Sequence, residues 1–140
     1  MQIKLIKNTD TSMCLAYKVA RVVYAETGAR TLSGVEALTS MIKNLSDISG
    51  ISISDIVNDS NLFPVLKSNA PNHERLFIHA SDNAFQMCVR VASRMLRGGL
   101  PDACFGAVRF HHSNTIPDWA IARGYIADID GMLFYQWGGK

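Results

Sequence analysis

The feature that most constrains the fold is a helical repeat of apolar residues that ends at a glycine. Between Thr11 or Ser12 and Thr27, apolar residues recur with the three-and-four spacing of one helix face. These residues are Leu15, Ala16, Val19, Ala20, Val22 and Val23. Gly28 follows them, and glycine is common just after a helix because it adopts the left-handed backbone at little cost. The sequence therefore predicts an amphipathic helix that must bury one face against other elements.

Three later segments also have helical patterns. The second helix is predicted over 33–45, and its start has the Ser-x-x-Glu form of a capping box between Ser33 and Glu36. A short third helix is expected after Ser52, which is a favourable N-cap residue. The fourth is expected over 81–97 and ends before a pair of glycines.

The C-terminal third has the pattern of a small antiparallel sheet. Residues 104–112 are predicted to be extended, and residues 126–129 and 132–135 are short apolar runs joined by Asp130-Gly131. Asp-Gly between two such runs is a strong signal for a two-residue hairpin turn. A long loop over about 58–79, with two prolines, separates the third and fourth helices, and loops of this length are often functional.

Length and composition are those of one globular domain. The chain has 140 residues, of which 48% are hydrophobic, enough for one substantial core. We therefore expect a single α+β domain over residues 1–140, mostly helical, with a small antiparallel sheet or hairpin in its C-terminal third. The formal net charge is +2 and the basic residues are scattered, so a nucleic acid partner is not expected.

Targeting signals and cysteine motifs are absent from the sequence. No apolar run approaches the roughly 20 residues of a membrane span, and residues 1–8 lack the apolar region of a signal peptide. We therefore expect synthesis in the cytoplasm without a recognisable signal peptide. Cys14, Cys88 and Cys104 are odd in number and widely spaced, which argues against a disulfide framework and a zinc site. No metal or other cofactor is predicted.

Glu26 is the candidate catalytic residue. It lies in the last turn of the first predicted helix among mainly apolar residues. The negative end of the helix dipole and partial burial both favour the protonated form of its carboxyl group. A general acid needs such a form, and glycosidic bond cleavage requires a proton on the leaving oxygen. The alternative is a helix-end glutamate that faces solvent, as most charged residues do.

A run of aromatic and histidine residues has the composition of a carbohydrate cleft. Residues 110–114 read Phe-His-His-Ser-Asn and residues 117–119 read Pro-Asp-Trp. Aromatic rings stack on sugar faces, and the polar side chains offer donors and acceptors for hydroxyl and acetamido groups. Adjacent residues of a strand point to opposite faces, so His111 and His112 do not both bind one metal, and one is expected to be a structural hydrogen bonder. Each aromatic residue could equally belong to the core.

These residues resemble the motifs of the SleB/CwlJ-type cell wall hydrolases, the catalytic domains associated with spore-cortex lysis. The resemblance covers residues 20–136. Its counterparts are 23–28, 34–39 with Asn44, Gly106-Ala107, 110–112, 117–119 and 129–134. The chain departs from the family pattern at Thr27 in place of alanine, at Leu45 in place of arginine, and at His111-His112 in place of the common Tyr-Asn.

The resemblance implies a lysozyme-like domain that cleaves the bond between N-acetylmuramic acid and N-acetylglucosamine in peptidoglycan. The best-studied members act as lytic transglycosylases, and Glu26 corresponds to their acid. A hydrolase needs a second carboxylate, but the remaining candidates have structural interpretations as cap, loop and turn residues: Glu36, Asp118, Asp128 and Asp130. The sequence therefore favours a lytic transglycosylase that forms 1,6-anhydro-muramic ends.

Two alternatives stay open, a muramidase-type hydrolase of the same bond and a non-catalytic peptidoglycan-binding module on the same fold. The expected partner is the peptidoglycan glycan strand, reached in the periplasm or outside the cell after export or lysis. The sequence gives no prediction of oligomeric state. The candidate substrate-binding residues are Tyr24, Ser40, Phe110, His111, His112, Asn114, Trp119 and Tyr135.

Overall fold

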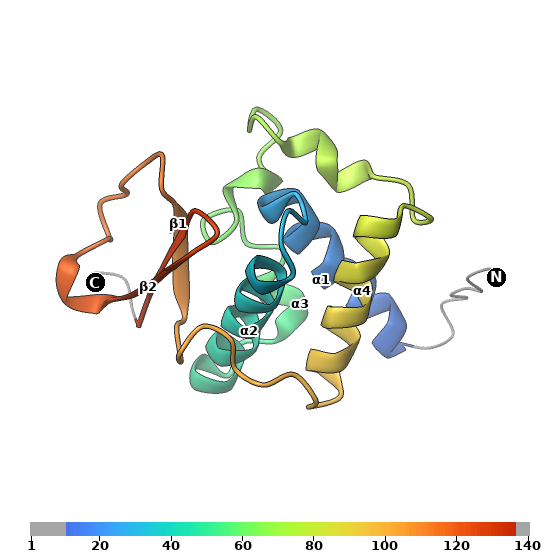
Figure 1. The fold of residues 1–140 in the computed structure, drawn as a ribbon, viewed down its shortest axis with the longest axis horizontal. Coiled ribbons are helices and arrows are strands. Elements are labelled where there is room, and N and C mark those ends of the chain that lie inside the picture. The colour runs from blue at the N-terminus through green and yellow to red at the C-terminus, as the bar shows by residue number, and fades with distance from the viewer. Residues whose placement is uncertain (1–10, 137–140) are drawn as a thin grey trace.

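The computed structural model describes residues 11–136. The α-helices lie in roughly the first two thirds of this range. The long helices are α1 (Thr11–Thr27), α2 (Leu32–Ser49) and α4 (Asn83–Leu96), with a single-turn helix, α3 (Ile53–Ile56), after α2. Helix α1 packs against both α2 and α4, and the sheet lies on the side of α2 away from α4 (Figure 1). Together these helices form the helical body of the molecule.

Helix α1 has the bounds that the sequence predicts. Most of its apolar face, including Val19 and Val23, is buried, and the helix packs against α2 and α4. Gly28 follows with a φ of 67°, and its N–H donates to the carbonyl oxygen of Tyr24 at 2.7 Å. The last turn of α1, which carries Glu26, is therefore fixed by the core on one side and by this glycine on the other.

The predicted capping box of α2 is wrong. Thr31 is the N-cap residue, and its hydroxyl accepts a hydrogen bond from the Gly34 N–H at 3.0 Å. Ser33 is exposed inside the first turn, and Glu36 forms an ion pair with Arg94 of α4 at 3.4 Å. Threonine also satisfies the free N–H groups of a first turn, so the helix begins earlier than predicted.

The other helix ends differ from the prediction by a few residues. Helix α2 continues beyond residue 45 until Gly50, which has a φ of 79°. Ser52 caps α3 as predicted, and its side chain accepts from the Asp55 N–H. Helix α4 begins after Asp82, the N-cap residue, whose carboxylate accepts a hydrogen bond from the Phe85 N–H at 3.0 Å.

The predicted long loop before α4 contains two 3-10 helices, η1 (Pro64–Leu66) and η2 (His73–Phe77). This segment is attached to α1 by Arg21, whose guanidinium donates to the carbonyl oxygens of Leu76 at 2.9 Å and Ile78 at 2.8 Å. The C-terminal end of this segment is therefore held against α1.

The predicted hairpin is confirmed. Strands β2 (Tyr125–Ile129) and β3 (Met132–Tyr135) are joined by Asp130 and Gly131, whose φ angles of 52° and 78° suit a two-residue hairpin turn. Strand β1 (Arg109–His112) pairs antiparallel with the other edge of β3, so the strand order among the described residues is β1-β3-β2.

The predicted extended segment over 104–112 is wrong in its first half. Cys104 to Ala107 form a tight turn, with left-handed backbone at Phe105 (φ 56°) and Gly106 (φ 81°). The Asp102 carboxylate accepts hydrogen bonds from the Cys104 N–H at 3.0 Å and the Gly106 N–H at 2.7 Å. An aspartate that binds backbone N–H groups ahead of it favours a turn over a strand, so β1 starts only at Arg109.

One hydrophobic core joins the helices to the sheet. Phe110 of β1 contacts the rings of Phe63 and Phe134, with centroids 5.8 and 6.2 Å apart. The same core includes Val35 and Leu38 of α2. Residues 11–136 therefore form a single α+β domain, as predicted, with a small three-stranded antiparallel sheet near the C-terminal end.

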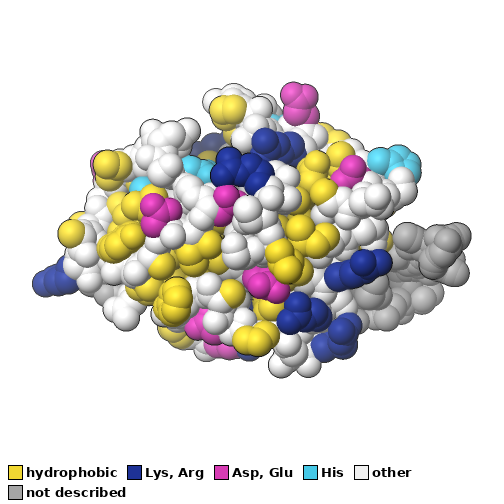
Figure 2. All heavy atoms as spheres, viewed as in Figure 1, with side chains coloured by type: hydrophobic (Ala, Val, Ile, Leu, Met, Phe, Trp, Pro, Cys, Tyr) yellow, Lys and Arg dark blue, Asp and Glu magenta, His cyan; other side chains and the backbone are white. Residues whose placement is uncertain are grey.

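The surface carries charges of both signs. On the face shown in Figure 2, Lys and Arg side chains are interspersed with Asp and Glu side chains and with hydrophobic groups. Within residues 11–136, no helix combines the length and the apolar character needed to cross a membrane.

Candidate active site

A cavity of about 710 Å³ lies between the helical body and the sheet. Its wall is built from the end of α1, the segment with η1 and η2, strand β1 with the loop after it, and the β2–β3 turn. This volume falls in the range of sites that hold small ligands, roughly 300–1,000 Å³. Charged and polar residues of the wall include Glu26, Asn61, Arg75, His112 and Asn114.

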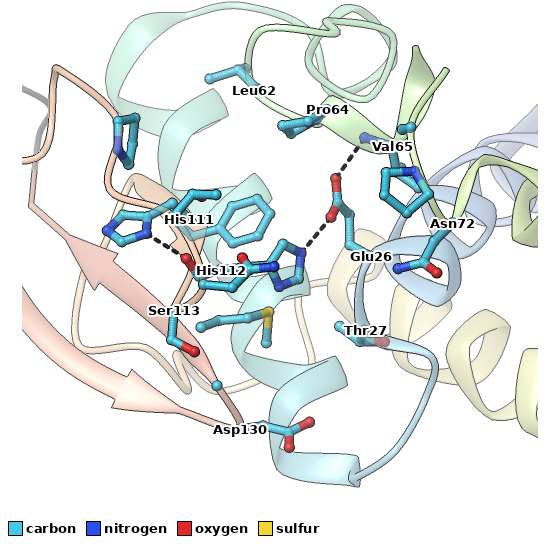
Figure 3. A pocket seen from close by; sticks show the side chains of 18 of the residues that line it. Glu26, Thr27, Leu62, Pro64, Val65, Asn72, His111, His112, Ser113 and Asp130 are labelled. Carbon is cyan, nitrogen blue, oxygen red and sulfur yellow. Dashed lines mark hydrogen bonds and ion pairs between the residues drawn. The ribbon is translucent and has the colours of Figure 1, made fainter. Parts of the chain in front are cut away.

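Glu26 is buried at the wall of this cavity, with 6% of its surface exposed. Its Oε2 accepts a hydrogen bond from the Val65 N–H at 3.2 Å, and its Oε1 lies 2.7 Å from Nε2 of His112 (Figure 3). The carboxyl group at the end of α1 is thus held by two segments, one at Val65 and one at His112, that are far apart in the sequence. The interpretation of Glu26 as a solvent-facing charge is wrong.

The two adjacent histidines point to opposite faces of β1, as predicted. His112 reaches Glu26, whereas Nε2 of His111 lies 2.9 Å from the Tyr135 hydroxyl. Nδ1 of His111 lies 2.8 Å from the carbonyl oxygen of His112 and must donate to it, so a neutral His111 accepts the Tyr135 proton at Nε2. Burial raises the pKa of Tyr135, with a smaller contribution from Tyr125, and so keeps this phenol protonated. The expected structural hydrogen bonder is His111.

Trp119 belongs both to the cavity wall and to an aromatic cluster. Its ring contacts His111 and Tyr135 edge-on, at centroid distances of 5.7 and 5.1 Å. The Arg109 guanidinium lies over the indole, 4.4 Å from its centroid. Burial lowers the pKa of Arg109, and the charge of Asp59 acts in the opposite direction. Arg109 therefore covers one face of the indole.

Two polar residues of α2 hold the segment before the sheet. The Asn44 amide donates to the carbonyl oxygen of Ala107 at 3.1 Å and to the Asp102 carboxylate at 3.3 Å. Burial alone would raise the pKa of Asp102, but its hydrogen bonds, this one included, lower it below the ordinary value. The Ser40 hydroxyl accepts from the Ala103 N–H at 3.0 Å. These contacts position β1, and therefore His112, from the helical body.

Most of the predicted site residues surround the same cavity. Among the predicted residues, those that line the cavity are Glu26, Phe110, His111, His112, Asn114 and Trp119. The structure places the other three outside its wall. Tyr24 packs edge-on against Phe85, Ser40 binds the segment before the sheet, and the Tyr135 hydroxyl binds His111.

The long loop before α4 supplies a wall of the cavity that sequence motifs did not predict. It contributes the Val65 N–H to Glu26 and also Arg75, whose guanidinium donates to the Ala25 carbonyl oxygen at 3.2 Å. A Cβ atom at position 28 would lie 3.1 Å from this guanidinium, so the absence of a side chain at Gly28 leaves room for Arg75. Glycine also adopts the positive φ of this position without strain. The only sequence signal for this wall was the length of the loop.

Asp130 is a second carboxylate at the cavity. It occupies the predicted hairpin turn, and its Oδ1 forms an ion pair with Arg30 at 2.7 Å. In Figure 3 it lies away from the Glu26 carboxyl, beyond His112. Its turn role is as predicted, whereas its place in the cavity wall was not.

No group of three or more His, Cys, Asp or Glu side chains within residues 11–136 is arranged to hold a metal ion. No protein family, curated protein or solved structure matches the chain. The chemical interpretation of the cavity therefore depends on its own geometry, above all on a buried carboxyl group in contact with an imidazole. Such a group is able to exchange a proton with a bound ligand.

Proposed function

We propose that this protein cleaves the glycosidic bond between N-acetylmuramic acid and N-acetylglucosamine in peptidoglycan, as a lytic transglycosylase. The observation that carries the proposal is the Glu26 carboxyl group, buried at the wall of the cavity and held at both oxygens. Trp119 and Asn114 at the same cavity offer an aromatic ring and an amide to a saccharide. A helix-borne acid that faces a small antiparallel sheet also agrees with a lysozyme-like architecture.

In the proposed reaction Glu26 acts twice. It first gives its proton to the glycosidic oxygen, so that the bond from this oxygen to C1 of the muramic residue breaks. The C6 hydroxyl then forms a bond to C1, and its proton returns to Glu26. The product is a 1,6-anhydro-muramic end, and no water is consumed.

The ion pair of Asp130 favours this reaction over hydrolysis. A two-carboxylate glycosidase needs a second carboxylate free to act as nucleophile or to activate water. Asp130 is the other carboxylate among the cavity-lining residues, and Arg30 holds one of its oxygens at 2.7 Å. Its presence nevertheless makes a muramidase-type hydrolase the second candidate.

The test is mass spectrometry of muropeptides released from purified peptidoglycan by the wild-type chain and by Glu26→Gln. We expect anhydro-muramic products from the wild type and a loss of about 10²–10⁴-fold in rate for the variant, the usual contribution of general acid–base catalysis. Glu36→Gln is the matched control, because Glu36 pairs with Arg94 outside the cavity.

Each other outcome has a definite meaning. Reducing ends in place of anhydro ends would show a hydrolase and direct attention to Asp130. Full activity of Glu26→Gln would rule out Glu26 as the acid. No release by either protein, on vegetative and on cortex peptidoglycan alike, would favour a non-catalytic binding module.

A further inference from the structure

We propose that His112 is the proton partner of Glu26, so that the pair, and not the carboxyl group alone, carries the proton used in the reaction. The inference rests on the proposed glycosidic cleavage and adds a positioning residue to it. It depends on the 2.7 Å contact between Nε2 of His112 and Oε1 of Glu26.

The two oxygens of Glu26 have different environments. Oε2 accepts a hydrogen bond from the main-chain N–H of Val65, and a main-chain N–H can only donate. The favoured position for a proton on the carboxyl group is therefore Oε1, on the side of His112. One proton between Oε1 and Nε2 gives two forms, a neutral acid beside a neutral imidazole or a carboxylate beside an imidazolium.

Burial makes this pair interdependent. Glu26 has 3% of its side chain exposed and His112 has 38%, so the carboxylate has little access to water, whereas the imidazole can exchange protons with it. The edge of the His112 ring also contacts Phe110, with centroids 5.5 Å apart, which limits its freedom to turn away. Burial disfavours a carboxylate, and a neighbouring imidazolium favours it.

The proton balance of the reaction is unchanged by the pair. In the imidazolium form the proton first passes from Nε2 to Oε1; it then moves from Oε1 to the glycosidic oxygen as the bond to C1 breaks, which leaves a carboxylate and a neutral imidazole. The proton of the C6 hydroxyl then enters the pair as the anhydro ring closes. The pair thus begins and ends each turnover with one proton.

Other charged or titratable groups face the same cavity. They come from η2 (Arg75), the α1–α2 loop (Arg30), β1 (His111) and the β2–β3 turn (Asp130). His73 acts on the pair indirectly, since its Nδ1 binds the Val65 carbonyl oxygen at 2.9 Å. All of them remain in place when only His112 is changed, so a comparison of variants isolates its contribution.

The first experiment is the pH profile of kcat/KM for wild type and His112→Gln on purified peptidoglycan. Glutamine can place an N–H donor where Nε2 lies but does not titrate, so in the variant only the Glu26 carboxyl group can carry the proton. We expect the basic limb of the profile to move to lower pH, because the variant lacks the imidazole that shares the proton. His79→Asn, an exposed histidine that binds Ser81, should leave the limb unchanged.

A basic limb at the same pH in His112→Gln would overturn the proposal, and so would a uniform loss of rate without a shift, because His112 would then only orient Glu26. Thermal unfolding of each variant checks that it is folded. An NMR titration of the His112 ring in wild type and Glu26→Gln tests the pair without any activity. Its midpoint should move to lower pH in the variant, since loss of the carboxylate destabilises the imidazolium; an unchanged midpoint would overturn the pair even if cleavage is confirmed.

Discussion

The helical body and the C-terminal sheet differ in how firmly they are held. Helices α1, α2 and α4 bury continuous apolar faces against one another, whereas β2 has no fully buried residue. The sheet joins the same core through β1 and β3, and the contacts of Asn44 hold the segment before β1. Glu26 belongs to the first region and His112 to the second. The proposed acid therefore has a fixed position, and its partner depends on the less extensive region.

The largest effect is expected from Phe85→Ala in the helical body. The Phe85 ring is fully buried and contacts the rings of Tyr17 and Tyr24, and the Arg21 guanidinium lies over it at 4.8 Å. Removing it should lower the free energy of unfolding by about 3–5 kcal/mol, as a large cavity in a core does. Denaturant unfolding followed by fluorescence measures the loss. If sheet residues kept native NMR signals after the helices had unfolded, the body would not be their support.

A smaller effect is expected from Asn44→Ala, which removes the link between the two regions. The carbonyl oxygen of Ala107 and one oxygen of Asp102 would lose their donor, at a cost of about 1–3 kcal/mol. We expect Cys104, next to these groups, to react faster with a thiol reagent while Cys88 in α4 changes less. Asn58→Ala, at an exposed position, is the control. Equal acceleration of both thiols would mean that the regions open together.

The two buried thiols predict a loss of stability at alkaline pH. Burial raises the pKa of Cys88 and of Cys104 to about 12, with smaller contributions from Asp82 and Asp102 respectively. In the unfolded chain both thiols ionise from about pH 9 upward. Above that pH the unfolded state binds fewer protons, so stability is lost as the pH rises from about 9 to about 12, by up to about 1.4 kcal/mol per pH unit for each thiol.

Urea unfolding at pH 8 and pH 10 measures this loss. Cys88→Ala should remove the part of the alkaline stability loss that comes from the thiol in the helical body. Cys104→Ala should remove the part that comes from the thiol in the segment before the sheet. An unchanged slope in both variants would assign the alkaline loss to other groups.

The smallest effect on stability is expected from Asp130→Asn. Asparagine tolerates the left-handed backbone of the turn, so the change removes mainly the ion pair with Arg30, whose side chain is 66% exposed. The expected loss is below about 1 kcal/mol and smaller still at high salt. Melting temperatures at low and high salt measure it. A large loss of cleavage by this folded variant would identify Asp130 as the second carboxylate of a hydrolase.

Local patterns predicted the elements better than their ends. The periodicity of α1 and the Asp130-Gly131 turn depend on neighbouring residues, so sequence alone locates them. Ser33 and Thr31 both have side chains that cap helices, and the choice of Thr31 depends on the path of the chain into α2. The turn after Asp102 was missed because the apolar residues that follow it also suit a strand. The hydrogen bonds of the Asp102 carboxylate that form the turn are not evident from residue types.

The candidate site was predicted in its residue types and missed in its contacts. Glu26 was identified from its place at the end of a helix, but its partner His112 lies 86 residues later. Only the strand alternation indicated that the two histidines have separate roles. The Val65 N–H could not be predicted, because every residue other than proline carries that group.

That main-chain donor has a consequence for how the protein tolerates mutation. The hydrogen bond to Oε2 of Glu26 survives any change of side chain at position 65 that leaves the local backbone intact, except a change to proline. The bond to Oε1 needs the imidazole of His112 in particular, or another side chain with a donor in the same place. Substitutions at position 65 should therefore leave the environment of Oε2 largely unchanged, whereas substitutions at position 112 should change the environment of Oε1 directly.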